Sequence, residues 1–247
     1  MTLLIENLTY RDVAKTIDHS LLRPELDDRF VADGCRLAAE YDVASVCVRP
    51  ADVARARAIL AGTDVAVGTT VGFPHGNHLT ATKVFEAERA LADGATELDM
   101  VIQIGALKAG RDADVQADIA AVVEVGHAAG ALVKVIFENA YLTDDEKIRA
   151  CHLTEAAGGD FVKTSTGFAP SGATHEDLIL MRRNVAPHVR VKAAGGVRTL
   201  DALLEVMALG VTRVGATATK TMLDDFKARK RGDAVAAGPG DSATGGY

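Results

Sequence analysis

Residues 160–196 read DFVKTSTGFAPSGATHEDLILMRRNVAPHVRVKAAGG and contain two short apolar runs, each interrupted by a lysine. We expect strands over Phe161–Thr164 and Arg190–Ala193, separated by one βα unit that places them side by side in a parallel sheet. Lysine is seldom buried without a partner, so Lys163 and Lys192 inside such strands need an explanation.

Six similar runs elsewhere complete a set of eight expected strands: Lys15–Asp18, Ala44–Val48, Val65–Val71, Glu97–Ile102, Leu132–Phe137 and Arg213–Gly215. Segments with helical spacing lie between them, such as Arg29–Tyr41 and Ala113–Ala129. Helix boundaries are marked by an N-terminal capping box and by glycines just past helical runs, namely Thr143 with Glu146, and Gly94, Gly130, Gly158 and Gly210.

Eight strand–helix repeats with short connections predict a single-domain (β/α)8 TIM barrel, which we place over residues 1–230. An open doubly wound sheet is the alternative, but it usually carries a GxGxxG turn after its first strand, and this sequence has none there. Residues 231–247 are rich in Gly and Ala and lack periodicity, so we expect a flexible tail, which ends in the aromatic Tyr247.

Composition excludes several classes of function. The net charge of −7 and the absence of a basic patch argue against a nucleic-acid partner. We expect no membrane span, because no stretch approaches roughly 18 apolar residues, and no signal peptide, because the N-terminus lacks a basic leader and a long apolar run. The three cysteines are odd in number and form no CxxC, which favours a reducing cytoplasm.

The buried lysines indicate nucleophilic chemistry. Alternate side chains of a barrel strand face inward, so we expect Lys163 and Lys192 to face the lumen, together with Lys134. One buried lysine could be salt-bridged to a core carboxylate, but three in neighbouring strands fit that interpretation poorly. A free lysine has a pKa of about 10.4, and burial or a neighbouring ammonium lowers it, so one lysine can be the nucleophile while another activates it.

Carboxylates are expected to face the same lumen. Asp99 lies between apolar residues in TELDMVIQIG, which makes it a candidate proton shuttle or lysine partner. Asp18 and Glu138 are expected to end strands one and five, where a structural carboxylate and a direct role are equally compatible with the sequence. His75 and His78 show no metal-ligand spacing, and we expect no metal site.

Three consecutive βα loops predict phosphate binding. After the last three strands come Ser165-Thr166-Gly167, Ala194-Gly195-Gly196 and Gly215-Ala216-Thr217. Barrels often bind phosphate with these loops, and glycine lets backbone N–H groups approach an anion closely.

The motifs ELDMV, VKVIFEN, DFVKTSTGF and VKAAGGVRT, with IDHSLL, SVCVRP and GFPHGN, resemble the deoxyribose-phosphate aldolase family from about Leu8 to Lys230. The resemblance implies a metal-free, cofactor-independent class I aldolase on a TIM barrel. Such an enzyme acts in nucleoside catabolism and reversibly cleaves 2-deoxy-D-ribose 5-phosphate into D-glyceraldehyde 3-phosphate and acetaldehyde. We expect a homodimer or a higher homo-oligomer.

By resemblance, Lys163 forms the Schiff base, Lys192 lowers its pKa and relays protons, and Asp99 is the acid/base partner through a water. The positions that match the family's substrate and phosphate contacts are Asp18, Gly167, Gly195, Gly196, Gly215 and Thr217. Some members end in a mobile tail with a terminal tyrosine, which makes Tyr247 a further catalytic candidate. Phe168 replaces a lysine found in some members, and Thr217-Ala218 stands where paired serines are often found, so phosphate affinity is the property these departures affect.

Two alternatives remain at this point. The first is another phosphate-binding barrel lyase or isomerase, which would need a base but no reactive lysine. The second is a non-catalytic barrel that only binds a sugar phosphate, against which the intact set of Lys163, Lys192 and Asp99 argues.

Overall fold

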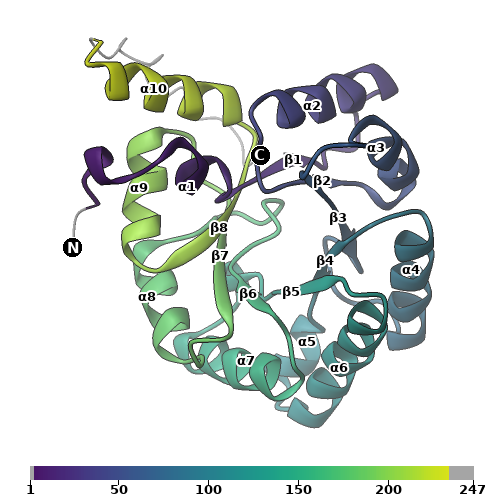
Figure 1. The fold of residues 1–247 in the computed structure, drawn as a ribbon. Coiled ribbons are helices and arrows are strands. Elements are labelled where there is room, and N and C mark those ends of the chain that lie inside the picture. The colour runs from purple at the N-terminus through teal and green to yellow at the C-terminus, as the bar shows by residue number, and fades with distance from the viewer. Residues whose placement is uncertain (1–2, 234–247) are drawn as a thin grey trace.

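The computed structural model describes residues 3–233 and shows a closed barrel of eight parallel strands in sequence order. Helices surround the barrel on its outside (Figure 1). The strands are β1 (Ile17–Leu21), β2 (Ser45–Val48), β3 (Ala66–Val71), β4 (Glu97–Val101), β5 (Leu132–Ile136), β6 (Phe161–Lys163), β7 (Arg190–Ala194) and β8 (Val211–Ala216). The predicted TIM barrel is confirmed.

The helices follow the strands as βα units require. They are α1 (Tyr10–Ala14), α2 (Asp28–Glu40), α3 (Val53–Ile59), α4 (Thr80–Ala92), α5 (Ile104–Lys108), α6 (Asp112–Ala128), α7 (Asp144–Ala156), α8 (His175–Arg183), α9 (Leu200–Ala208) and α10 (Thr219–Arg231). Short 3₁₀ turns lie at Ile5–Asn7, Pro50–Asp52 and Asn139–Tyr141. The capping box at Thr143 and Glu146 is present at the start of α7, and Gly94, Gly130, Gly158 and Gly210 follow helices with positive φ as expected.

The first strand was predicted too early. Lys15 is not in a strand but caps the C-terminus of α1, whose N-terminus is fixed by a capping box between Thr9 and Asp12. Strand β1 runs from Ile17 to Leu21 through three polar residues, all buried. Asp18 is therefore the second residue of β1 and not its end, because the strand continues through the buried polar residues His19 and Ser20.

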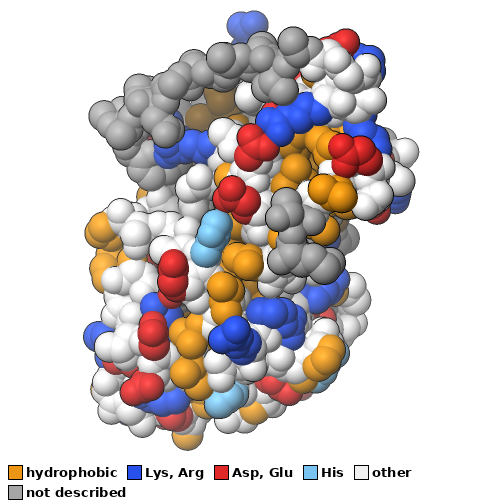
Figure 2. Space-filling model, turned by 90° about the vertical axis from the view of Figure 1, so that its left-hand side faces the viewer, with side chains coloured by type: hydrophobic (Ala, Val, Ile, Leu, Met, Phe, Trp, Pro, Cys, Tyr) orange, Lys and Arg blue, Asp and Glu red, His pale blue; other side chains and the backbone are white. Residues whose placement is uncertain are grey.

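The apolar core lies between the strands and the helices. Outward-facing residues such as Val46, Leu98, Val133 and Val191 are fully buried there and pack with apolar faces of the helices. Each such side chain contributes about 1.5–3 kcal/mol relative to an exposed one. On the face that carries α8 and α9, acidic and basic side chains are interspersed, with no extended basic patch (Figure 2).

Candidate active site

Strand register brings the predicted lysines into the barrel lumen. Asp99 of β4 pairs with Lys134 of β5, and Lys163 of β6 pairs with Lys192 of β7. Paired residues of a sheet share one face, so all four side chains point inward. Lys163 is the last residue of β6, at the carboxyl-end rim where barrel active sites lie.

Asp99 lies at the centre of this group and contacts all three lysines. One of its oxygens, Oδ2, lies 2.6 Å from Lys163 Nζ and 2.8 Å from Lys192 Nζ, while Oδ1 lies 2.9 Å from Lys134 Nζ. The Asp99 side chain is fully buried. Burial alone would raise the pKa of its carboxyl, but the charges of Lys134, Lys163 and Lys192 hold that pKa well below the usual value. Asp99 is therefore an anion placed between the two lysines singled out in the sequence.

A second layer lies deeper in the lumen. Asp18 Oδ2 accepts a hydrogen bond from Lys192 Nζ, and Asp18 Oδ1 accepts one from Arg213. Arg213 also binds Glu97 at 2.8 Å, and Lys134 Nζ lies 2.6 Å from Glu97 and 3.2 Å from Asp18. Despite its burial, these cations lower the pKa of Asp18. Asp18 thus forms a buried ion pair with Lys192 on the lumen side away from the rim.

We call these seven side chains, which ion pairs join, the lumen cluster: Asp18, Glu97, Asp99, Lys134, Lys163, Lys192 and Arg213. Four bases face three acids, and Lys163 is the base with the fewest carboxylate contacts within the cluster. Lys134, in contrast, contacts three carboxylates, which raise its pKa well above the usual value although burial opposes them. Lys163 is therefore the lysine of the lumen cluster with a single carboxylate partner, Asp99.

Sequence reasoning missed the roles of Glu97 and Arg213. Glu97 has the same strand parity as Asp99, which would have placed it in the lumen. Arg213 contacts Glu97 across 116 positions of sequence, and only the closed barrel brings these two residues together.

The predicted phosphate loops form a small cleft beside the lumen cluster. Gly195, Gly196, Gly215 and Thr217 line it together with Val197, Arg198 and Ala216. Gly195 and Gly196 have φ of 79° and 95°, which favours glycine at both positions. A Cβ atom at Gly215 would lie 3.7 Å from Lys192 Cε. The cleft and the lysines are therefore neighbours.

Gly167 belongs to the loop between β6 and α8, and this loop packs on the cleft. A Cβ atom on Gly172 of this loop would lie 2.4 Å from the Gly195 carbonyl oxygen, so the two backbones touch. Gly167 itself has a φ of 91°. It does not line the small cleft but is followed by Phe168, whose ring meets Phe73 edge to face at 5.4 Å. This pair joins the loops after β6 and β3 at the mouth of the barrel.

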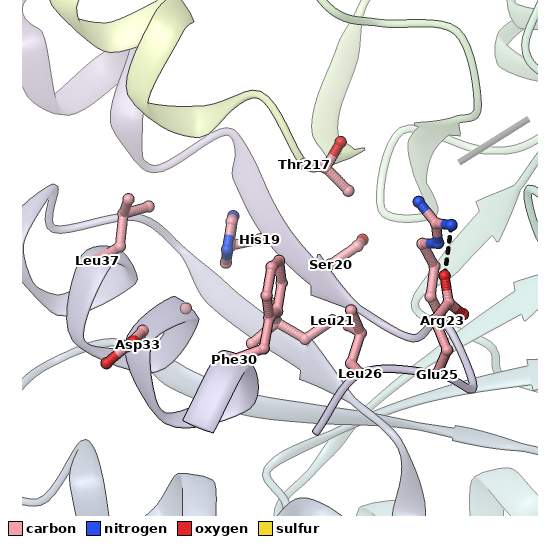
Figure 3. Close-up of a pocket in the computed structure, with 11 residues that line it drawn as sticks. His19, Ser20, Leu21, Arg23, Glu25, Leu26, Phe30, Asp33, Leu37 and Thr217 are labelled. Carbon is pink, nitrogen blue, oxygen red and sulfur yellow. Dashed lines mark ion pairs between the residues drawn. The ribbon is translucent and has the colours of Figure 1, made fainter. Parts of the chain in front are cut away.

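A larger groove of about 530 Å³ adjoins this small cleft. It lies between β1, α2 and the loop after β8, and its lining includes His19, Ser20, Phe30 and Thr217 (Figure 3). Thr217 lines both the groove and the cleft. The buried amines lie outside the groove lining, so the groove is a neighbour of the candidate site and not its centre.

Other predicted features are placed as follows. His75 and His78 are exposed, and within residues 3–233 no three His, Cys, Asp or Glu side chains group in a way that could hold a metal ion. Cys47 is a free, buried cysteine, and burial raises the pKa of its thiol to about 11. No helix in the same stretch is long and apolar enough to cross a membrane. Tyr247 and most of the predicted tail lie outside the described residues.

Comparisons with known proteins identify the family of this chain. A family model described as DeoC/LacD family aldolase matches residues 13–228. A deoxyribose-phosphate aldolase of Rhodopirellula baltica is 51% identical over 218 residues, covering 88% of this chain and 90% of the relative. One from Bacillus cereus is 51% identical over 217 residues, covering 87% and 97%.

Solved structures of aldolases are also similar. Deoxyribose phosphate aldolase from Aeropyrum pernix has a TM-score of 0.82 at 28% identity, with 90% of this chain and 93% of that chain covered. A protein described as QR15, an aldolase, has a TM-score of 0.84 at 34% identity, with 88% and 97% covered. Fold and relatives agree on one class of protein, the aldolases, which are carbon–carbon lyases. The chain belongs to the DeoC/LacD aldolase family, among the deoxyribose-phosphate aldolases.

Proposed function

We propose that this chain reversibly cleaves 2-deoxy-D-ribose 5-phosphate into D-glyceraldehyde 3-phosphate and acetaldehyde through a Schiff base on Lys163. The observation that carries the proposal is the arrangement of Lys163 and Lys192 on one oxygen of Asp99, at 2.6 and 2.8 Å. A nucleophilic amine, an anion and a second amine are then within proton-transfer distance of one another at the rim of the barrel.

The reaction begins when the neutral amine of Lys163 attacks the C1 aldehyde of the open-chain sugar phosphate. Loss of water gives an iminium ion, which withdraws electrons from the neighbouring carbons. Removal of the C3 hydroxyl proton then breaks the C2–C3 bond and releases D-glyceraldehyde 3-phosphate. An enamine of acetaldehyde remains on Lys163. Proton delivery to its carbon from Asp99 and Lys192, or from Tyr247, restores the iminium, and hydrolysis frees acetaldehyde.

In this proposal the phosphate of the substrate binds at the cleft of Gly195, Gly196, Gly215 and Thr217. Backbone N–H groups of glycine-rich loops can bind an anion without a side-chain charge. Because Gly215 lies against Lys192, a phosphate in this cleft leaves the rest of a five-carbon sugar directed toward the lumen cluster. Asp18, buried below Lys192, supports that lysine in this arrangement.

Reductive trapping tests the proposal. The protein is mixed with acetaldehyde and borohydride, digested and examined by mass spectrometry, and we expect one ethyl group on Lys163. Lys163→Ala should fold, as judged by circular dichroism, carry no adduct and retain less than about 1% of turnover. Lys192→Ala should trap acetaldehyde only at higher pH, because the neighbouring positive charge is lost. An adduct elsewhere, or turnover by Lys163→Ala, would refute the assignment.

The same experiment separates the alternatives. A barrel isomerase would convert a sugar phosphate without trapping acetaldehyde, and a non-catalytic binding protein would bind the sugar phosphate without turnover. The proposed catalytic role of Tyr247 predicts that deleting residues 240–247 slows deuterium exchange into acetaldehyde. Unchanged exchange would remove Tyr247 from the mechanism.

We further propose an oligomer in a reducing, cytoplasmic environment. The aldolase from Aeropyrum pernix is described as having a unique tetrameric structure, and Cys35, Cys47 and Cys151 are free and buried here. Light scattering after size-exclusion chromatography should give a mass of at least twice that of one chain. A mass of one chain at micromolar concentration would contradict the oligomer.

A further inference from the structure

Glu138 has an unusual backbone and a buried side chain next to the candidate site. It lies two residues beyond the end of β5 and has φ of 59° and ψ of 65°, in the left-handed region that favours glycine. Its side chain is only 2% exposed. A residue other than glycine keeps such a conformation only where its surroundings fix it, and such residues concentrate at functional sites.

The backbone on either side of Glu138 continues the pairing of β5 with β6. Phe137 N–H donates to the Lys163 carbonyl oxygen at 3.0 Å, and Asn139 N–H donates to the Thr164 carbonyl oxygen at 2.9 Å. In a regular parallel ladder, successive hydrogen bonds of this kind lie two residues apart on both segments. Here the donors Phe137 and Asn139 lie two residues apart, but the acceptors Lys163 and Thr164 are adjacent. Glu138 is therefore the extra residue of a bulge, a feature that redirects a side chain.

The redirected carboxylate holds the turn that follows Lys163. Thr166 N–H donates to both Glu138 carboxylate oxygens, at 3.2 and 3.3 Å, and Thr166 Oγ1 donates to Oε2. Thr166 Oγ1 in turn accepts a hydrogen bond from Phe168 N–H at 3.0 Å. One carboxylate thus fixes both sides of Gly167, the residue of this turn that matches the phosphate contacts of the family.

The charge of Glu138 is also close to Lys163. Burial raises the pKa of the Glu138 carboxyl, whereas its bonds to Thr166 and the charge of Lys163 act in the opposite direction. Glu138 is not among the ion-paired members of the lumen cluster, and its oxygens accept hydrogen bonds from Thr166. It therefore contacts the turn directly, whereas it acts on Lys163 only as a nearby charge.

We propose that Glu138 is a positioning residue that fixes the Ser165–Phe168 turn and so sets the distance between the bound phosphate and Lys163. This inference rests on the proposed function and adds a specificity determinant to it. The carboxylate is predicted to matter for substrates that carry a phosphate and to matter little for the amine chemistry itself.

Two variants remove the interaction from opposite sides without removing volume. Glu138→Gln loses the negative charge and one of the two acceptor oxygens, and Thr166→Val loses the hydroxyl but keeps the shape and the N–H. Each should raise KM for 2-deoxyribose 5-phosphate about tenfold, as expected for one lost hydrogen bond to a charged group, with a smaller change in kcat. KM for unphosphorylated 2-deoxyribose should change less than about twofold in the same variants.

Two controls make the result specific. Thr166→Ser keeps the hydroxyl and should keep KM near that of the parent protein. Glu155→Gln removes a carboxylate that accepts the Ala186 N–H at 3.0 Å between α7 and the loop before β7. It should leave KM for both substrates unchanged. The double variant Glu138→Gln/Thr166→Val should be no worse than the worse single variant, because both remove the same interaction.

The proposal would be overturned if KM rose equally for both substrates, or if both variants lowered only the melting temperature. Borohydride trapping of acetaldehyde on Lys163 is measured in the same samples. Trapping that persists in Glu138→Gln while KM stays unchanged refutes the positioning role alone. Absence of trapping in the parent protein refutes the proposed function.

Discussion

The excess of bases in the lumen cluster predicts that two buried lysines differ in their effect on stability. Lys134 Nζ contacts Glu97, Asp99 and Asp18 at 2.6, 2.9 and 3.2 Å and is fully buried. Lys134→Met keeps the length of the side chain but leaves three acids facing three bases, one of which is Lys163. Breaking a buried ion pair by removing one partner costs about 3–5 kcal/mol, so Lys134→Met should lower the free energy of unfolding by about that amount.

Lys163→Met should cost much less. If the Lys163 amine is neutral, its removal takes away no charge, and the three remaining bases still balance the three acids. The loss is then one hydrogen bond to the charged Asp99, or about 2 kcal/mol. The two variants should differ by about 1–3 kcal/mol, which corresponds to roughly 2–12 °C in melting temperature for a domain of this size.

Thermal and urea unfolding followed by circular dichroism measure the difference. Lys83→Met provides the reference, since Lys83 and Asp118 form a fully buried pair at 2.6 Å outside the lumen. It should behave like Lys134→Met. If Lys163→Met is as destabilising as these two variants, Lys163 is a charged member of the cluster, and the argument from charge balance is wrong.

Two further perturbations test the loop after β3 and the effect of pH. Gly76→Ala should destabilise the protein by about 2 kcal/mol more than Gly62→Ala in urea unfolding. Both glycines have positive φ, but only a Cβ at Gly76 would lie 1.9 Å from the Ile102 carbonyl oxygen. Equal losses of stability in the two variants would contradict this packing. Burial lowers the pKa of His19 to about 4. As pH falls, His19 is therefore protonated in the unfolded chain before it is protonated in the folded protein. The free energy of unfolding should decrease by about 3 kcal/mol between pH values of about 6.5 and 4. His19→Asn should flatten that slope and the exposed His75→Asn should not, whereas parallel slopes for the two variants would disprove the assignment.

The sequence was sufficient to predict the barrel and the central amines. Strand parity alone placed Lys163, Lys192 and Asp99 in the lumen, because apolar neighbours such as Val162, Val191 and Leu98 identify the outward face. The same rule failed at β1, where polar residues fill the strand and α1 precedes it. Alternation identifies a strand only where one of its faces is apolar.

Contacts across the lumen could not be predicted in the same way. The Arg213–Glu97 pair joins β8 to β4, and it depends on the diameter and stagger of the closed barrel rather than on any local pattern. The bulge at Glu138 depends on one residue in the left-handed region, and the sequence VIFEN carries no glycine there. Both features arise from closure and register, which hydrophobic periodicity does not encode.

The position of the charges explains why the barrel remains stable. Barrel lumens are usually filled with branched apolar side chains, and replacing buried ion pairs with such residues is often neutral or stabilising. The lumen cluster therefore cannot be the source of the stability of this fold, which instead lies in the apolar layer between strands and helices. A cluster that contributes little to stability can hold one more base than acid. Within this cluster, Lys163 has the fewest carboxylate partners and ends β6 at the rim of the barrel.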